Sequence, residues 1–164
     1  MKIKHTLKPI YNKDSYILIL GSIPSITSRK KDFYYSHKQN RFWKIINKLF
    51  NANLNTKEEK IEFLLNNNIA LYDIIKECTI NNSSDSSIKN IKIINLLPIL
   101  NNSKIKYIFC EGKLSYNLFK KYYSNLPVEF YYLPSTSSAN ASYNLDKLLN
   151  IYNIIKEKLD TKNT

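Results

Sequence analysis

Short apolar runs alternate along this chain with longer segments whose apolar residues recur at helical spacing. Apolar runs of four to six residues that end at polar or turn residues are typical of buried strands. The first such run leads directly into the turn Gly21-Ser22-Ile23-Pro24-Ser25, and the second is followed by Asp73. Strands are predicted, in chain order, at about 16–20, 69–72, 105–110 and 128–133.

The segments between these runs predict helices. Phe42, Ile45, Ile46 and Leu49 follow the i, i+3, i+4, i+7 pattern of an amphipathic helix, and Asn40 lies at or near its N-cap. Thr56 and Glu59 form the sequence pattern of a capping box for a second helix. Helices are predicted at 41–50, from Thr56 to the Asn66-Asn67-Asn68 run, at 113–123 and at 143–158.

Alternation of strands and helices predicts a single domain over 1–164 of the α/β class. We expect three α/β/α layers around a central four-stranded, mostly parallel sheet. Residues 1–14 are expected to form an arm, and 88–102 is not assigned, because it is apolar but contains Pro98. The loops 21–40 and 134–142 both follow strands, so they should meet at the edge where ligands bind in such sheets.

The charge composition favours one class of partner. Lys and Arg number 25 against 13 Asp and Glu, a net charge of +12 that favours a polyanionic partner such as nucleic acid. The chain is also crowded with Asn, Ile and Tyr, which indicates skewed base composition, so the charge supports this partner without establishing it.

Cysteine and hydropathy patterns restrict the cofactors and the compartment that we expect. Cys78 and Cys110 are far apart with no CxxC or Cys/His cluster, so neither a disulfide framework nor a metal site is predicted, and both should be buried thiols. No apolar run approaches the length of a membrane span, and no signal-peptide pattern follows Met1. We therefore expect a cytoplasmic monomer without metal, cofactor or membrane contact.

Four motifs, in this order, resemble those of the uracil-DNA glycosylase superfamily, and most closely its DNA-deoxyinosine glycosylases. They are GSIPS, FYYSHKQNRFW, NIALYDIIKEC with SSDSSI, and LPSTSSANASY. The resemblance implies a uracil-DNA glycosylase-like fold and a monofunctional base-excision repair enzyme. Its substrate would be double-stranded DNA containing a deaminated base, from which hypoxanthine is flipped out and released by hydrolysis of its N-glycosidic bond.

The resemblance also implies roles for individual residues. Asn40 is the candidate catalytic residue, and Tyr35 is the candidate ring that stacks on the flipped base, with Phe33 and Tyr34 as substitutes. The candidate base-binding residues are Gly21, Ser22, Ile23, Tyr35 and His37. The candidate DNA-binding residues of the late loop are Ser135, Thr136, Ser137, Ser138, Ala139 and Asn140, with Pro134 or Ala139 as a wedge between bases.

Three residues depart from the pattern of this superfamily. Ile23 stands where mismatch-specific uracil glycosylases usually carry a water-activating asparagine, Lys38 replaces the proline of an HPQN stretch, and Ser138 replaces the second proline of LPSTSPAN. The first departure disfavours a uracil or mismatched-thymine glycosylase. The other two affect the loops that carry Asn40 and the DNA contacts.

The sequence is also compatible with other chemistry. Asp85, among serines, is a second catalytic candidate, and either it or Asp73 could activate water as a general base. Lys38 could act as a Schiff-base nucleophile of a lyase, and Asn40 could be an ordinary N-cap. At the level of function, the alternatives are a mismatch-specific uracil/thymine glycosylase, a catalytically silent binder of damaged DNA, and a nucleotide-binding enzyme, which the absence of GxGxxG or a P-loop disfavours.

Overall fold

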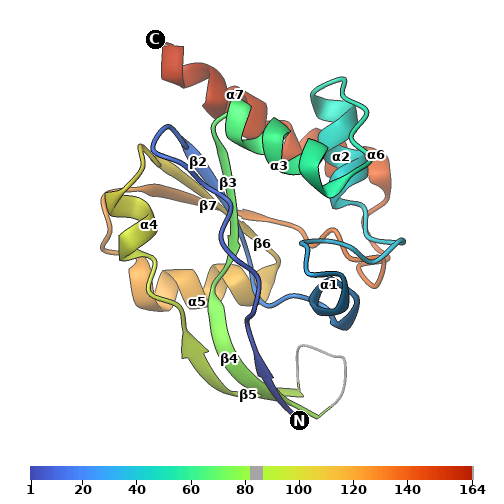
Figure 1. The fold of residues 1–164 in the computed structure, drawn as a ribbon, viewed down its shortest axis with the longest axis vertical. Helices are drawn as coiled ribbons and strands as arrows, with labels where there is room; N and C mark the ends of the chain where they lie inside the picture. Colours follow the sequence, from blue (N-terminus) through green and yellow to red (C-terminus); the bar gives the residue numbers. More distant parts are fainter. Residues whose placement is uncertain (82–86, 164) are drawn as a thin grey trace.

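The computed structural model describes residues 1–81 and 87–163, which form two sheets with helices packed around the larger one (Figure 1). The predicted candidate Asp85 lies outside the described residues. The strands are β1 (Lys2–Lys4), β2 (Ile17–Gly21), β3 (Ile69–Asp73), β4 (Ile75–Ile80), β5 (Ile88–Ile93), β6 (Tyr107–Glu111) and β7 (Glu129–Leu133). The helices are α1 (Ile26–Lys31), α2 (Phe42–Leu49), α3 (Lys57–Asn66), α4 (Leu97–Asn101), α5 (Lys113–Tyr123), α6 (Leu145–Tyr152) and α7 (Ile154–Asp160), followed by the 3-10 turn Thr161–Asn163.

The larger sheet has four parallel strands in the order β3-β2-β6-β7. The four predicted strands and their parallel arrangement are confirmed. All five residues of β2 are buried, as expected of a central strand that is covered on both faces.

Alternate residues of the central strands contribute to two separate cores. Ile17 and Ile19 pack in the cluster that includes side chains of α2, α3, α6 and α7, whereas Leu18 and Leu20 pack in the cluster with α4 and α5. Figure 1 shows these two groups of helices on opposite sides of the sheet. The predicted three-layer α/β/α architecture is confirmed.

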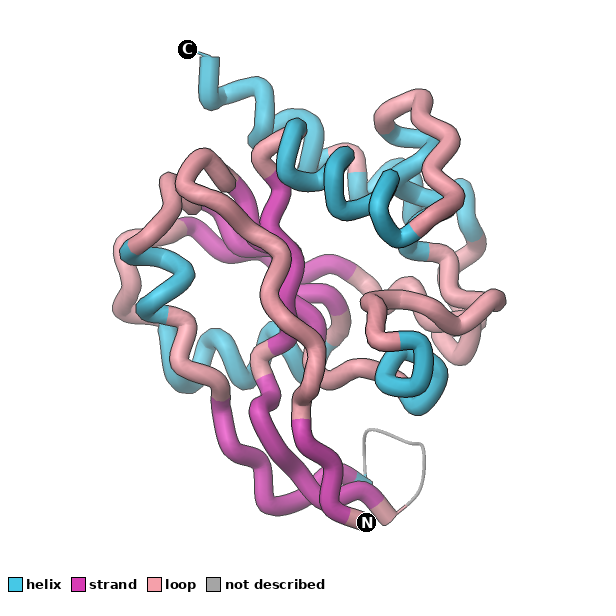
Figure 2. The backbone as a smooth tube through the Cα atoms, viewed as in Figure 1, coloured by secondary structure: helices cyan, strands magenta, loops and turns pink. Residues whose placement is uncertain are grey.

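A smaller antiparallel sheet extends the molecule on the side of the N-terminus (Figure 2). Its order is β1-β4-β5, and β4 follows β3 after Ile74. The prediction that residues 1–14 are only an arm is wrong, because Ile3 of β1 pairs with Cys78 of β4. A three-residue strand with one buried side chain has no local sequence signal when its partner lies so far away along the chain.

The helix predictions are confirmed for α2, α3 and α5. The capping box at α3 is present, with Glu59 N donating to Thr56 Oγ1 at 3.1 Å and Thr56 N donating to Glu59 Oε1 at 2.8 Å. The predicted continuous helix at 143–158 is instead two helices, α6 and α7, divided at Asn153. Within the described residues, no helix is both long and apolar enough to cross a membrane.

Candidate active site

Three neighbouring parallel strands end in a glycine and two acidic residues. Gly21 ends β2 and pairs with Asp73 at the end of β3, and Glu111 ends the neighbouring strand β6. The residues two positions earlier in these strands share one core cluster: Ile19, Leu71 and Phe109. Because side chains alternate along a strand, the three end residues face the same side of the sheet. Two carboxyl groups therefore flank a glycine at the carboxyl edge.

Gly21 provides space for the Asp73 carboxylate. A Cβ built on Gly21 would lie 2.4 Å from Asp73 Oδ1 and 3.2 Å from the Tyr35 hydroxyl oxygen. The other carboxylate oxygen, Asp73 Oδ2, lies 2.8 Å from His5 Nε2, and both side chains are buried. A carboxylate only accepts hydrogen bonds, so Nε2 carries the proton. The N-terminal segment thus holds Asp73 in place beside Gly21.

Tyr35 lies over this row of strand ends. Its φ of 53° is in the left-handed region, which is rare and strained for a bulky residue. Its ring stacks on Phe42 with centroids 4.1 Å apart, and its hydroxyl donates to Glu111 Oε2 at 3.4 Å. Burial, and then the Glu111 and Asp73 charges, raise the pKa of Tyr35 well above its ordinary value, so the phenol remains a donor. Phe42 covers one face of the ring, and Tyr35 is also among the residues that line the neighbouring hollow.

The carbonyl oxygen of the Asn40 side chain is already fully engaged. Asn40 Oδ1 accepts from Phe42 N at 2.8 Å and from Thr136 Oγ1 at 3.0 Å. A backbone N–H can only donate, so the atom that faces it must be the amide oxygen. Asn40 Nδ2 makes no hydrogen bond to any residue in the described parts of the chain. Asn40 therefore bonds the first N–H of α2 from the position before the N-cap, Arg41, and keeps two donors available.

Glu111 is tied to the late loop through Thr136. Glu111 Oε1 accepts from Thr136 N at 2.6 Å and lies 2.9 Å from Thr136 Oγ1. Thr136 is fully buried. Burial raises the pKa of Glu111, the hydrogen bonds from Thr136 oppose this shift, and the Asp73 charge adds to it.

Arg41 joins the two predicted site loops. Its backbone N and its Nε donate to Thr136 O at 3.1 and 3.3 Å, and its Nη2 donates to Ser137 O at 2.7 Å and to Asn140 O at 3.3 Å. Its Nη1 donates to Tyr143 O. The prediction that loops 21–40 and 134–142 meet at one edge of the sheet is confirmed.

The late loop exposes only part of its predicted DNA-binding set. Ser138 and Ala139 are exposed at the tip, and Ser135 and Ser137 are partly exposed. Thr136, predicted as a DNA contact, is fully buried and bonded within the site. Its burial follows from its position next to β7, where Glu111 and Asn40 both bond its hydroxyl.

Two further residues of this loop brace it from inside. Asn140 Nδ2 donates to Ser135 O at 3.0 Å, so this side chain holds the loop's shape. Pro134 is buried, and its carbonyl accepts from the Tyr152 hydroxyl at 2.5 Å. Of the two predicted wedge residues, Pro134 is thus buried at the base of the loop, and Ala139 is the exposed one.

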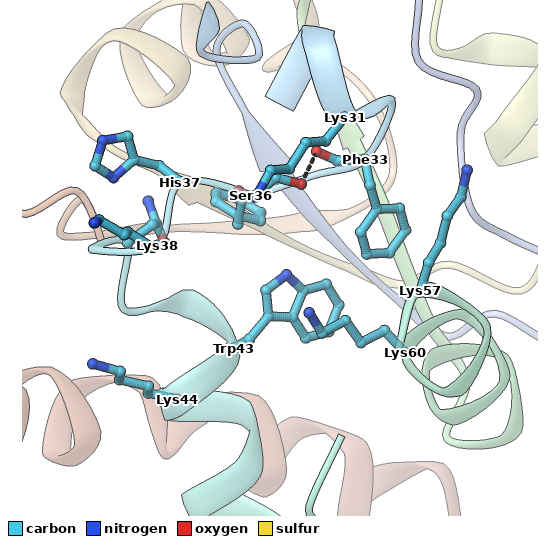
Figure 3. A pocket seen from close by; sticks show the side chains of 11 residues that line it. Lys31, Phe33, Ser36, His37, Lys38, Trp43, Lys44, Lys57 and Lys60 are labelled. Carbon is cyan, nitrogen blue, oxygen red and sulfur yellow. Dashed lines mark hydrogen bonds between the residues drawn. The ribbon is translucent and has the colours of Figure 1, made fainter. Parts of the chain in front are cut away.

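A hollow of about 390 Å³ opens beside Asn40 and Tyr35. Figure 3 shows Phe33 and Trp43 in it with lysine side chains around them. The lysines that line it are Lys31, Lys38, Lys44, Lys57 and Lys60. The amino groups of Lys57 and Lys60 lie 5.8 and 5.1 Å from the ring centroids of Phe33 and Trp43. The hollow thus combines positive charge with aromatic surface.

The other predicted base-binding residues are placed unequally. His37 is exposed at the hollow, and its Nδ1 accepts from Gln39 N at 3.1 Å. Ser22 O accepts from Ile75 N at 2.9 Å, which ties the turn to the start of β4. Ile23 packs against the core cluster on the α4 and α5 side. The Ile23 side chain is only partly buried there.

The aromatic neighbours of Tyr35 belong to the core. Phe33 is 6% exposed and stacks on Trp43, and Tyr34 is 3% exposed. The Tyr34 hydroxyl donates to Lys8 O at 2.6 Å, and its carbonyl accepts from Trp43 Nε1 at 3.0 Å. Neither ring is free to substitute for Tyr35 in stacking on a base.

Comparisons with known proteins match this arrangement. The family model of the uracil DNA glycosylase superfamily matches residues 8–158. The chain belongs to the uracil DNA glycosylase superfamily. Hypoxanthine DNA glycosylase from Methanosarcina barkeri is 31% identical over 116 residues, covering 68% of this chain and 73% of that protein. Hypoxanthine DNA glycosylase from Methanosarcina acetivorans is 27% identical over 147 residues, covering 88% of this chain and 93% of that protein.

A solved structure agrees with this assignment. The solution NMR structure of a candidate uracil DNA glycosylase from Methanosarcina acetivorans superposes with a TM-score of 0.81, at 26% identity, over 95% of this chain and 99% of that one. As a member of the superfamily, this chain is a DNA N-glycosylase that acts on DNA. In the ranges 1–81 and 87–163, no group of three or more His, Cys, Asp or Glu residues could hold a metal ion.

Three residues of this superfamily member were not identified from the sequence. Glu111 could have been found from the sequence. It follows the predicted strand 105–110 directly, and by alternation its side chain lies on the same face as Tyr107 and Phe109. Arg41 and His5 act through contacts with residues 68 to 102 positions away. Contacts at that separation require the folded structure.

Proposed function

We propose that this glycosylase releases hypoxanthine from DNA by hydrolysis and does not cleave the backbone. Support comes from the two relatives that carry this activity in their names, and from Ile23, which stands where mismatch-specific uracil glycosylases usually have asparagine. The proposal rests chiefly on the Asn40 amide, because its oxygen is fixed by Phe42 N–H and Thr136 while Nδ2 keeps its two donors at the hollow.

Asn40 acts in this proposal as a donor. Hydrolysis of an N-glycosidic bond puts negative charge on the departing base and positive charge on the sugar. Donors that are fixed before the reaction and directed at developing charge stabilise the transition state with little reorganisation. With both lone pairs of Oδ1 engaged, Asn40 contributes through Nδ2, to the base or to the oxygen of the attacking water. Tyr35 stacks on the flipped base with the ring face opposite Phe42.

Asp73 is the candidate for the electrostatic partner of the sugar. A carboxylate near a developing oxocarbenium ion stabilises its positive charge. His5 engages Asp73 Oδ2, so Oδ1 is the oxygen directed over Gly21. Lys38 is exposed at the rim of the hollow, and it serves in this proposal as a charge for the DNA backbone.

Two surfaces would hold the DNA on either side of Asn40. Ser138 and Ala139 at the tip of the late loop are small and exposed, which suits close approach to a groove. The lysines that line the hollow are suited to binding phosphates. The exposed edges of Phe33 and Trp43, which also line it, are suited to contacts with bases. Burial lowers the pKa of Lys60; Glu59 opposes this shift, and the Lys31 charge adds to it. A bound phosphate would relieve this repulsion between lysines.

End-labelled duplexes that carry inosine, uracil, xanthine or a T:G mismatch test the proposal. The duplexes are incubated with wild type and with Asn40→Ala, then treated with alkali to cleave abasic sites. We expect release of hypoxanthine in preference to the other bases, and a loss of about 10²–10³-fold in rate for Asn40→Ala. Faster release of uracil or thymine would replace the proposed substrate, and binding without release on every duplex would indicate a silent binder.

A parallel sample without alkali separates hydrolysis from lyase chemistry. Strand breakage that needs no alkali, is lost in Lys38→Ala and is trapped by borohydride would contradict the monofunctional mechanism. Lys104→Ala is the matched control, because Lys104 is also an exposed lysine but lies at Asp14, outside the site.

A further inference from the structure

A short chain of contacts leads from Glu111 to Asn40. Glu111 Oε1 lies 2.9 Å from Thr136 Oγ1, and Thr136 Oγ1 lies 3.0 Å from Asn40 Oδ1. Thr136 is fully buried, and its backbone N–H also donates to Glu111 Oε1 at 2.6 Å. The three side chains come from β6, the late loop and the loop before α2. Their contacts connect the end of the sheet with the candidate catalytic amide.

The number of protons in this chain determines which of its contacts are hydrogen bonds. A threonine hydroxyl has one proton. If Glu111 is ionised, this proton has two acceptors, and the charged carboxylate attracts it more strongly than the amide oxygen of Asn40 does. The Thr136 oxygen would then face Asn40 Oδ1 with a lone pair against a lone pair. If Glu111 Oε1 carries a proton, it donates this proton to Thr136 Oγ1 while its remaining lone pair accepts from Thr136 N, Thr136 Oγ1 donates to Asn40, and both side-chain contacts are hydrogen bonds.

We propose that Glu111, as a neutral carboxylic acid, is the positioning residue of Asn40 and acts through the Thr136 hydroxyl. The acid fixes the direction of the hydroxyl, and the hydroxyl together with Phe42 N–H fixes the carboxamide. Asn40 Nδ2 then points to the reacting groups. This inference rests on the proposed function, in which Asn40 is the donor.

The surroundings of Glu111 favour the neutral acid. Burial and the Asp73 charge raise the pKa of Glu111, although the bonds from Thr136 and Tyr35 oppose this shift. Several polar and charged groups from other elements lie near Glu111. They are Tyr35 of the loop after α1, Asp73 of β3 with its partner His5, Tyr132 of β7 and Tyr152 of α6. The Arg41 guanidinium is also near and contacts the late loop. Arg41 donates its hydrogen bonds to backbone carbonyls of that loop, and Asp73 is a like charge.

The sign of the pH dependence follows from the raised pKa. The neutral form of Glu111 persists above the ordinary carboxyl range and is lost as pH rises through its pKa in the folded protein. Ionisation then draws the Thr136 proton away from Asn40. The rate of base release should therefore fall as Glu111 ionises.

Single-turnover rates and DNA affinities across the pH range test the chain in wild type, Thr136→Val, Thr136→Ser and Glu111→Gln. We expect Thr136→Val to lower the rate about 10- to 100-fold, because a misdirected catalytic group costs this much, with DNA affinity within about twofold. Thr136→Ser keeps the hydroxyl and should restore most of the rate. Glu111→Gln cannot ionise, so the fall that wild type shows at higher pH should be absent. Glu62→Gln, an exposed change of equal charge on α3, should keep the wild-type pH profile.

Equal rates for the valine and serine variants, or an unchanged alkaline fall in Glu111→Gln, would overturn the proposal. A second measurement does not depend on activity. In the free protein, NMR can follow the carboxyl carbon of Glu111 and the side-chain amide of Asn40 during a pH titration. We expect both to titrate with the same raised pKa. If no duplex is cleaved, the proposed function fails while this titration still tests the chain; an Asn40 amide that does not respond to Glu111 would refute it.

Discussion

The absence of a side chain at Gly21 is required by Asp73, and Gly21→Ala tests this requirement. The Cβ of alanine would lie 2.4 Å from Asp73 Oδ1 and 3.2 Å from the Tyr35 hydroxyl. The backbone of Gly21 is ordinary strand, and it is not among the positive-φ residues, so alanine adds no backbone strain. The cost therefore comes mainly from displacing the carboxylate, with a smaller part from the contact with the Tyr35 hydroxyl.

The magnitude follows from how Asp73 is held. Overpacking of a buried site costs about 1–3 kcal/mol. Displacing Asp73 also strains its 2.8 Å bond to His5, and both partners are almost fully buried, so a further fraction of the several kcal/mol for breaking a buried pair is added. We expect a loss of about 2–4 kcal/mol in the free energy of unfolding. For a chain of this length, that corresponds to about 5–15 °C in Tm.

Chemical and thermal unfolding of a double-mutant cycle isolates the contact. The cycle comprises wild type, Gly21→Ala, Asp73→Ala and the double variant. Once Asp73 is alanine, the 2.4 Å clash is gone and only the 3.2 Å contact with the Tyr35 hydroxyl remains, so the added methyl at Gly21 should cost less than about 1 kcal/mol. Gly112→Ala is the control, because its strain comes from φ of 92° and its Cβ would meet only Ser135 Cβ, at 3.9 Å.

The coupling between positions 21 and 73 decides the result. If Gly21→Ala costs the same in the presence and absence of the Asp73 carboxylate, the carboxylate does not occupy the space above Gly21, and the reasoning is refuted. If Gly112→Ala shows the same dependence on Asp73, the coupling is not specific to this contact.

Three further predictions concern the bonds from Arg41 to the late loop, the hollow beside Asn40, and the capping box of α3. Arg41→Lys should lower stability by about 1–3 kcal/mol in urea unfolding, since one ammonium cannot reach the carbonyls that the guanidinium bonds; an unchanged midpoint would contradict a clamp. Lys57→Ala with Lys60→Ala should reduce the salt slope of DNA binding by about 0.9 for each phosphate that no longer has a lysine partner, while Glu62→Ala should not. Thr56→Ala should cost about 1 kcal/mol by removing the capping box of α3, with no change in base release.

The parallel sheet was predictable because its signals are local. Each strand is a short run of apolar residues with turn or polar residues behind it, and the helices α2, α3 and α5 on its faces carry their own apolar stripes. The antiparallel sheet was not predictable in the same way. β1 has only three residues, and β5 has no fully buried residue, so their pairing with β4 is not encoded in either segment alone.

The candidate site was predicted in outline, and its internal bonds were not. Asn40, Tyr35 and the late loop meet as the order of motifs implied. The direction of the Asn40 amide depends on a backbone N–H two residues on and on a hydroxyl 96 residues away. The burial of Thr136 likewise depends on where β6 ends. The sequence of the loop alone could not show which of its hydroxyl residues, Ser135 to Ser138, is buried.

The two strand-end carboxyl groups are fitted to different tasks by their partners. Asp73 has a proton donor, His5, and an open glycine beside it, which suits an ionised carboxylate near the positive charge of the sugar. Burial and the like charge of Asp73 raise the pKa of Glu111, against the hydrogen bonds that Thr136 and Tyr35 donate to its carboxyl group. If both were ionised, their repulsion across Gly21 would compete with the bonds that order Asn40. The proposed chain of contacts assigns the neutral form to Glu111, because its proton would order Asn40 through the Thr136 hydroxyl.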